Sequence, residues 1–222
     1  MYMFYWLLLL IIPLAASANV KMTYKKYSKI SNSRGITAEE VARRILDNNG
    51  LYNIRIERIG GHLTDHFDPS AGVRRLSDSV YGKTSVAAIG VAAHECGHAV
   101  QHAEEYSPIV IRNKLVPITN FCSRASYFII LAGMILSFNT VLINIGIILF
   151  LAVVAFQLIT LPVEFNASSR ALKTLEGDAI LEMDEVPKAR KVLKAAALTY
   201  VASLITAIIQ LLRLIAISRS SD

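Results

Sequence analysis

The chain has 222 residues, 54% of them hydrophobic, and its mean hydropathy is +0.45. The apolar excess is concentrated in blocks long enough to cross a bilayer, which excludes an ordinary soluble protein. The formal net charge is +6, and the basic residues flank the apolar blocks. This placement favours a lipid bilayer as the partner and not nucleic acid. Only two cysteines are present, Cys96 and Cys122, so no disulfide framework is predicted.

Residues 1–20 predict an N-terminal transmembrane helix. The apolar stretch up to Ala18 is followed by four lysines between residues 21 and 29, and no Lys or Arg precedes it. The positive-inside rule then places the N-terminus outside and residue 21 onward in the cytoplasm. The small residues at 16–18 leave a cleaved signal peptide open as an alternative.

Residues 21–116 predict a cytoplasmic catalytic segment. An amphipathic helix is expected over 36–49, with Thr37 and Glu40 as a capping box and Gly50 at its end. The alternation of apolar and charged residues over 52–59 predicts a strand.

A second short strand is expected near 73–76, with a polar turn over 63–69 between the two strands. These strands would form a short β-hairpin or sheet.

The sequence His94-Glu95-Cys96-Gly97-His98 is an H-E-x-x-H motif. Residues four apart share a helix face, so both imidazoles can bind one Zn²⁺ with Glu95 beside its water. The small apolar run 85–93 predicts a buried helix, capped by Thr84 or Ser85. Buried polar side chains are costly without a partner, and a metal ion would supply one. The alternative is a helix that carries two surface histidines.

Two further apolar stretches, 117–137 and 139–161, predict a transmembrane hairpin over 117–161. A cytoplasmic segment over 162–195 and a C-terminal transmembrane helix over 196–217 follow. Of the 23 Lys and Arg residues, 14 lie in 21–117, six in 162–195 and three elsewhere. This asymmetry makes the side that holds both charged segments cytoplasmic, in an integral, multi-pass cell membrane protein.

A catalytic zinc site needs a third protein ligand. His102 would lie about 12 Å along the helix axis from His94, at 1.5 Å per residue, too far for one ion to bridge. Glu164 is the better candidate, because it follows the third apolar stretch and Pro162 suits the first turn of a new helix. Alternatively, Glu164 is an interfacial carboxylate, solvated or paired with Arg170. Other acidic candidates lie in a charged stretch that looks solvated: Glu176, Asp178, Glu182 and Asp184.

Three motifs together resemble one family. They are L-T-D-H-F-D-P at 63–69, H-E-C-G-H-A-V-Q at 94–101 and P-V-E-F-N-A-S at 162–168. The chain resembles the YugP-type bacterial membrane zinc metallopeptidases over residues 24–210. The order of elements is also similar to the gluzincins, including the HtpX and Ste24 membrane proteases. The resemblance implies a mainly α membrane protein, with about four transmembrane helices and a small zincin-like α+β catalytic domain.

The gluzincin resemblance also implies site residues. In those proteases a glutamate ligand lies in an E-x-x-A-D motif on a later helix, where Glu164 and Ala167 match and Ser168 replaces the aspartate. That aspartate commonly holds a ligating histidine in its tautomer. Ser168 can accept a hydrogen bond but brings no charge, so Asn166 or Asp65 could take its place.

The motif and the resemblance predict a membrane-bound zinc-dependent endopeptidase with one Zn²⁺ per chain, held by His94, His98 and Glu164. Metal-activated water would attack the peptide bond with Glu95 as the general base. The substrate would be a peptide or protein, membrane proteins included, and could pair with the strand before the H-E-x-x-H helix. Zinc binding should then depend on the correctly folded hairpin.

The sequence offers two candidates for the residue that donates a hydrogen bond to the oxyanion. Arg170 is one candidate, and a histidine of the 62–66 region, His66 above all, is its rival. Each could equally be a structural or turn residue. The alternative function is a non-proteolytic zinc-binding scaffold or transporter. The few ionisable residues in the later spans count against transport, and the intact Glu95 counts against a silent scaffold.

Overall fold

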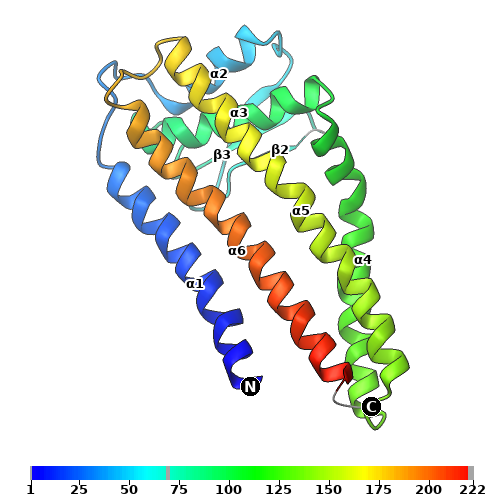
Figure 1. Ribbon diagram of the computed structural model, residues 1–222. Helices are drawn as coiled ribbons and strands as arrows, with labels where there is room; N and C mark the ends of the chain where they lie inside the picture. Colours follow the sequence, from blue (N-terminus) through cyan, green and yellow to red (C-terminus); the bar gives the residue numbers. More distant parts are fainter. Residues whose placement is uncertain (1, 69–70, 220–222) are drawn as a thin grey trace. The chain divides into compact units, whose positions relative to one another are not determined.

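The computed structural model describes residues 2–68 and 71–219 and shows a mainly α-helical membrane protein with a small sheet (Figure 1). Within these residues, four helices are long and apolar enough to cross a membrane. They are α1 (Tyr2–Tyr27), α4 (Ser107–Ile135), α5 (Thr140–Gly177) and α6 (Val186–Arg219). The remaining elements are α2 (Ala38–Asn48), α3 (Val86–Ala103), β1 (Arg55–Ile59), β2 (His66–Asp68) and β3 (Val73–Ser77). The expected fold class is confirmed.

The long helices extend beyond the apolar stretches that predicted them. Helix α4 begins at Ser107, ten residues before the expected start, and α6 begins at Val186 in the charged segment. The expectation that Pro162 begins a new helix is wrong, because Pro162 lies inside the continuous helix α5. A proline removes one backbone donor, but packing along the rest of a long helix can outweigh that loss. Glu164 therefore lies on the same helix as the third apolar stretch.

The described chain forms two compact units. The helical unit contains the residues up to Ser17, Ser107–Pro162 and those from Thr199 onward, and the site unit contains Ala18–Tyr106 and Val163–Leu198. Helices α1, α5 and α6 contribute residues to both units.

In the helical unit, α4 and α5 form a hairpin at close range (Figure 1). A Cβ on Gly146 would clash with the Ile130 side chain of α4, and Ser126 Oγ donates to the Gly146 carbonyl at 2.7 Å. Small residues let helix backbones approach, and a satisfied hydroxyl strengthens the contact where water is excluded. Helix α6 joins the unit through Ser218, whose hydroxyl lies 2.7 Å from Asn144 Oδ1 of α5.

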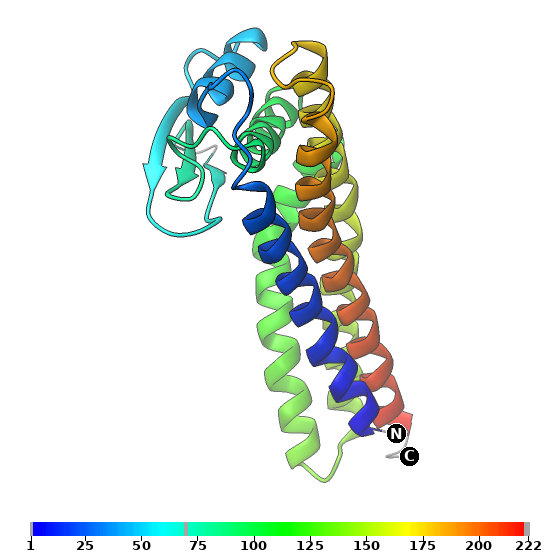
Figure 2. The same cartoon turned by 90° about the vertical axis from the view of Figure 1, so that its left-hand side faces the viewer.

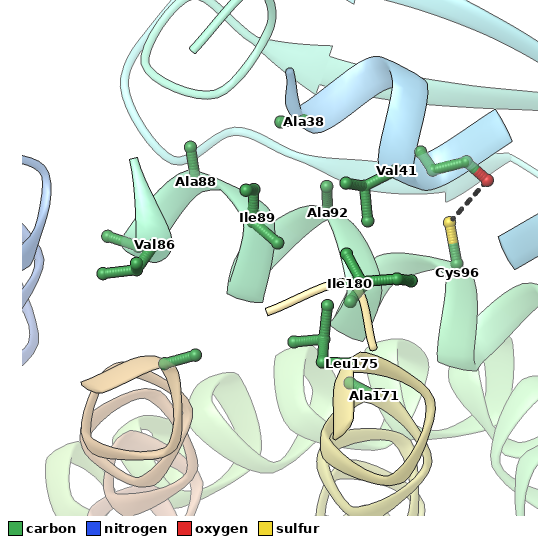
Figure 3. Close-up of a cluster of buried hydrophobic side chains, with 14 of the residues drawn as sticks. Ala38, Val41, Val86, Ala88, Ile89, Ala92, Cys96, Ala171, Leu175 and Ile180 are labelled. Carbon is green, nitrogen blue, oxygen red and sulfur yellow. Dashed lines mark hydrogen bonds between the residues drawn. The ribbon is translucent and has the colours of Figure 1, made fainter. Parts of the chain in front are cut away.

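In the site unit, α3 packs against α2, β2 and β3 (Figure 2). Its other side meets Leu175 and Ile180, and Figure 3 shows these two side chains across α3 from Ala38 and Val41 of α2. Ser85 Oγ accepts from the Ala88 amide and caps the helix, which confirms Ser85 as the N-cap. The α3 sequence is rich in alanine, so neighbouring elements can approach it on several sides.

The capping box of α2 is confirmed. Glu40 accepts from the Thr37 amide at 2.7 Å and from its hydroxyl at 2.8 Å, at the first turn of α2. Gly50 lies just past the helix end with a φ of +71°, a conformation that glycine adopts without strain.

The described sheet has the order β1-β3-β2, with β1 parallel and β2 antiparallel to β3. The expectation of a turn throughout 63–69 is wrong at residues 66–68, which form β2, while Pro69 lies outside the described residues. Polar side chains do not prevent pairing at a sheet edge, because the backbone supplies the hydrogen bonds. Strand β3 is central, so both of its edges are occupied. A substrate therefore cannot add to β3, contrary to expectation.

Candidate metal centre

His94 and His98 of α3 meet Glu164 of α5 at one point. The three ligand atoms all lie within 4.8 Å of one another. Glu164 Oε2 is 3.3 Å from His94 Nε2 and 3.5 Å from His98 Nε2. Both histidines are largely buried, and the Glu164 side chain is 2% exposed. His102, four residues further along α3, is exposed and lies against Phe67 instead.

These distances fit a tetrahedral zinc ion. Two ligands about 2.1 Å from zinc at the tetrahedral angle lie about 3.4 Å apart. Glu164 Oε2 has no hydrogen-bond partner of good geometry among the described residues, although two ring nitrogens lie beside it. The separations therefore suit ligand atoms around one centre better than hydrogen bonds between them. A buried carboxylate oxygen in this situation is costly unless a cation occupies that centre.

The surroundings of His98 are negatively charged as well. Burial disfavours its imidazolium, but the adjacent Glu164 carboxylate and the charge of Glu95 outweigh burial and raise the pKa of His98. A divalent cation between these groups would take over the role of that proton.

Gly97 lets α3 and α5 come close enough to form the centre. A Cβ at Gly97 would lie 2.8 Å from the Ala167 carbonyl oxygen and 3.2 Å from the Ala167 Cα. Cβ atoms do not approach backbone atoms so closely without a shift of one helix. The glycine inside the H-E-x-x-H motif thus sets the distance between the two histidines and Glu164.

A different side chain contacts the Nδ1 atom of each histidine, while Nε2 faces Glu164. Ser168 Oγ lies 3.1 Å from His94 Nδ1, and Gln101 Oε1 lies 3.0 Å from His98 Nδ1. The Gln101 amide nitrogen donates to two acceptors, so its oxygen must accept from His98, and Nδ1 carries the hydrogen. That tautomer leaves the Nε2 lone pair of His98 facing Glu164.

Gln101 was missed from the sequence. It is fully buried and links α3 to α5, because its amide donates to the Val163 carbonyl at 2.8 Å and to Asn166 Oδ1 at 2.9 Å. The available signal was its position three residues after His98, within reach on the same helix face.

Asn166 and Arg170 continue this network away from the histidines. Arg170 Nε donates to Asn166 Oδ1 at 2.8 Å, and its Nη2 lies 2.7 Å from Glu104 Oε2. Asn166 thus supports Gln101 and not a histidine directly. These contacts of Arg170 join α5 to the end of α3.

Glu95 projects from α3 toward the sheet. Its Oε2 accepts a hydrogen bond from Arg74 Nη1 at 2.5 Å, and its side chain is 14% exposed. The sequence pattern indicates Arg74 only as a strand residue. No short-range pattern connects a strand arginine to a helix glutamate 21 residues later.

A family model described as "Putative neutral zinc metallopeptidase" matches residues 2–219. The chain belongs to this zinc metallopeptidase family. The chain is also 51% identical over 203 residues to a Bacillus subtilis (strain 168) protein named "Putative membrane protease YugP", covering 91% of this chain and 89% of the relative. No solved structure matches the chain. The family implies zinc, and the three residues at the α3–α5 contact are chemically suited to hold it.

Asp65 and His66 lie elsewhere in the site unit. Asp65 accepts from the Ser77 amide at 2.7 Å and from its hydroxyl at 2.8 Å, and burial raises the pKa of Asp65. His66 Nδ1 lies 2.9 Å from the Thr64 carbonyl oxygen. These contacts hold the loop before β2 and the end of β3, and they do not involve His94 or His98.

Cys96 faces away from the metal residues. Its thiol lies 3.6 Å from the Ala42 carbonyl oxygen of α2, as the dashed line in Figure 3 shows. Burial raises the pKa of Cys96 to about 12, so the thiol stays neutral. The cysteine in the motif is a packing residue and not a metal ligand.

Proposed function

We propose that this protein is a membrane-bound zinc-dependent endopeptidase whose single zinc ion is held by His94, His98 and Glu164. The observation that carries the proposal is the pair of 3.3 and 3.5 Å separations between Glu164 Oε2 and the two Nε2 atoms, beside an H-E-x-x-H glutamate. The family description and the name of the Bacillus relative support it.

Each residue would have a distinct part in hydrolysis. Zinc, when bound, supplies Lewis-acid activation of water and of the scissile carbonyl. The Glu95 carboxylate accepts the proton of the attacking water and passes it to the leaving amine. Ser168 and Gln101 orient His94 and His98 through their Nδ1 atoms. Arg170 or His66 remains the proposed donor to the oxyanion.

The substrate would be an extended peptide or protein segment, with membrane proteins included. Strand addition to β3 is excluded by its central position, so the outer edge of β2 is the better candidate. Strand β2 contacts α3, the helix that carries both histidines and Glu95.

We propose that the site unit faces the cytoplasm. Residues 21–117 and 162–195 together carry 20 of the 23 Lys and Arg residues, and such segments are retained on the cytoplasmic side. In this proposal, the membrane-spanning parts are residues 1–20, 117–161 and 196–217. The catalytic parts are residues 21–116 and 162–195.

A comparison of wild type with Glu95→Gln tests the activity. Both proteins, purified in detergent, should contain about one zinc per chain, because Glu95 is not a proposed ligand. Only the wild type should cleave an unfolded protein such as reduced casein, and a chelator should stop it. If both proteins contain zinc and neither cleaves casein, a zinc-binding scaffold or transporter is the better interpretation.

The ligand assignment is tested on helix α5 itself. Glu164→Ala should lose zinc, because two histidines alone bind it weakly. Glu176→Ala is the matched control, since Glu176 is an exposed carboxylate on the same helix. Equal zinc content in the two variants would show that Glu164 is not a ligand.

A further inference from the structure

Arg74 is a fully buried cation at the centre of the small sheet. Its side chain is 0% exposed, and it is the largest fully buried side chain in the described part of the chain. It pairs in register with Ile56 of β1 on one side and with Phe67 of β2 on the other. Its guanidinium lies 4.9 Å from the centre of the Phe67 ring. Backbone pairing on both sides and this ring leave the arginine little freedom to move.

Stability alone does not explain this arginine. Removing an ion from water costs several kcal/mol, and apolar replacements of buried ion pairs are often neutral or stabilising. Arg74 also leaves Nε and Nη2 without hydrogen-bond partners among the described residues. A pair selected for stability would satisfy those donors. Among the described residues, the guanidinium forms one ion pair, with Glu95.

The contact leaves Glu95 held at one oxygen only. Oε2 accepts from Arg74 Nη1, whereas Oε1 has no hydrogen bond among the residues that the structure describes. A glutamate has three side-chain torsions, and an unpaired carboxylate next to the metal residues would populate several rotamers. An arginine fixed in the central strand restricts the carboxylate to one of them and leaves the second oxygen open.

We propose that Arg74 is a positioning residue that holds the Glu95 carboxylate in one rotamer through Oε2 and leaves Oε1 open to accept the proton of the attacking water. This inference rests on the proposed peptidase function. Arg74 acts through Glu95 and touches neither the metal ligands nor the substrate. Its role is to reduce the number of Glu95 conformations that cannot accept a proton.

The test compares Arg74→Met and Arg74→Lys with wild type in casein cleavage, zinc content and thermal unfolding. Arg74→Met keeps an apolar chain and removes the tether, so kcat should fall about 100-fold while KM and zinc content stay unchanged. Arg74→Lys keeps the charge but not the guanidinium, so its kcat should lie between those of Arg74→Met and wild type. Arg58→Met is the matched control, because Arg58 of β1 lies in the same sheet but forms an exposed ion pair, with Asp78. The Arg58→Met protein should equal wild type in casein cleavage, zinc content and thermal unfolding.

Two results would overturn the inference while the proposed function stands. In one, the wild type cleaves casein and both Arg74 variants have the same kcat as wild type. The other is a loss of zinc and of thermal stability in parallel with activity, which would make Arg74 a structural residue. If Arg74→Met does not fold, Arg74→Lys decides, since a lowered kcat with full zinc content supports the role and wild-type kcat refutes it. An inactive wild type with bound zinc would instead refute the peptidase itself.

Discussion

Single residues behind the histidines decide which nitrogen faces Glu164. The hydroxyl of Ser168 contacts His94, and the amide of Gln101 contacts His98. Such partners commonly change metal affinity 10- to 100-fold when they are removed. The Ser168 hydroxyl is neutral, whereas the gluzincins, which this chain resembles, have an aspartate at the matching position. Replacing Ser168 by aspartate therefore compares a hydroxyl with a carboxylate as the partner of His94.

Ser168→Ala should weaken zinc binding about tenfold, because His94 loses the contact that orients its ring. Ser168→Asp should bind zinc at least as tightly as wild type, since a carboxylate makes the imidazole a better ligand. Competition with a chromophoric chelator measures both affinities. Ser169→Ala, an exposed neighbour, is the control. An unchanged affinity in Ser168→Ala would remove the serine from the site.

Cys96 should be inert in the folded protein despite its place in the motif. Burial raises its pKa to about 12, so at pH 8 only about one thiol in 10⁴ is the reactive thiolate. In a Cys122→Ser background, maleimide should label Cys96 only after unfolding, as mass spectrometry would show. The raised pKa also means that this thiol supports folding below about pH 9 and that this support is lost as pH rises toward 12. Rapid labelling of the native protein would contradict the buried position.

At the scale of elements, the contact between α3 and α5 makes the centre. Two glycines of α3 meet other helices at different distances. A Cβ at Gly97 would lie 2.8 Å from a backbone oxygen of α5, but a Cβ at Gly90 would lie 3.4 Å from the Ala189 Cβ of α6. The first position has no room for a methyl group, and the second is only tight.

Gly97→Ala should therefore destabilise the protein by about 1–3 kcal/mol and reduce zinc content, because α3 and α5 must separate. Gly90→Ala should be close to neutral, since the gain in helix propensity of about 1 kcal/mol offsets the tighter contact. Chemical denaturation and metal analysis of both variants provide the measurement. If Gly97→Ala keeps wild-type stability and zinc, the α3–α5 contact does not control the site.

At the scale of the whole molecule, the distribution of charge predicts one orientation in the membrane. Met183 is 90% exposed in the connection between α5 and α6, and Phe138 is 51% exposed in the turn between α4 and α5. Both positions tolerate a cysteine on grounds of exposure, and in the chain Phe138 precedes α5 whereas Met183 follows it.

In intact cells that express the Cys122→Ser protein, a membrane-impermeant maleimide should label Phe138→Cys and not Met183→Cys. Permeabilised cells should show labelling of both. The reason is the retention of Lys- and Arg-rich segments on the cytoplasmic side. The reverse pattern would place the site unit outside the cell.

Much of this protein was determined by short-range features of its sequence. Ser85 caps α3, Thr37 and Glu40 cap α2, and the four-residue spacing of His94 and His98 places both rings on one face. These relations lie within a helical turn, where backbone geometry fixes which side chains meet. The four apolar helices follow from composition for a similar reason, since each spanning helix satisfies its own backbone.

Only the tertiary structure decided the rest. The ends of α4, α5 and α6, the strand at His66–Asp68 and the pairing of Arg74 with Glu95 depend on packing partners that no local pattern specifies. The approach of Glu164 to both histidines depends on α3 touching α5 at Gly97, across more than 60 residues. Local sequence patterns indicate two histidines and a glutamate as ligands. The 3.3 and 3.5 Å separations between Glu164 Oε2 and the two Nε2 atoms are set by how closely α3 and α5 pack.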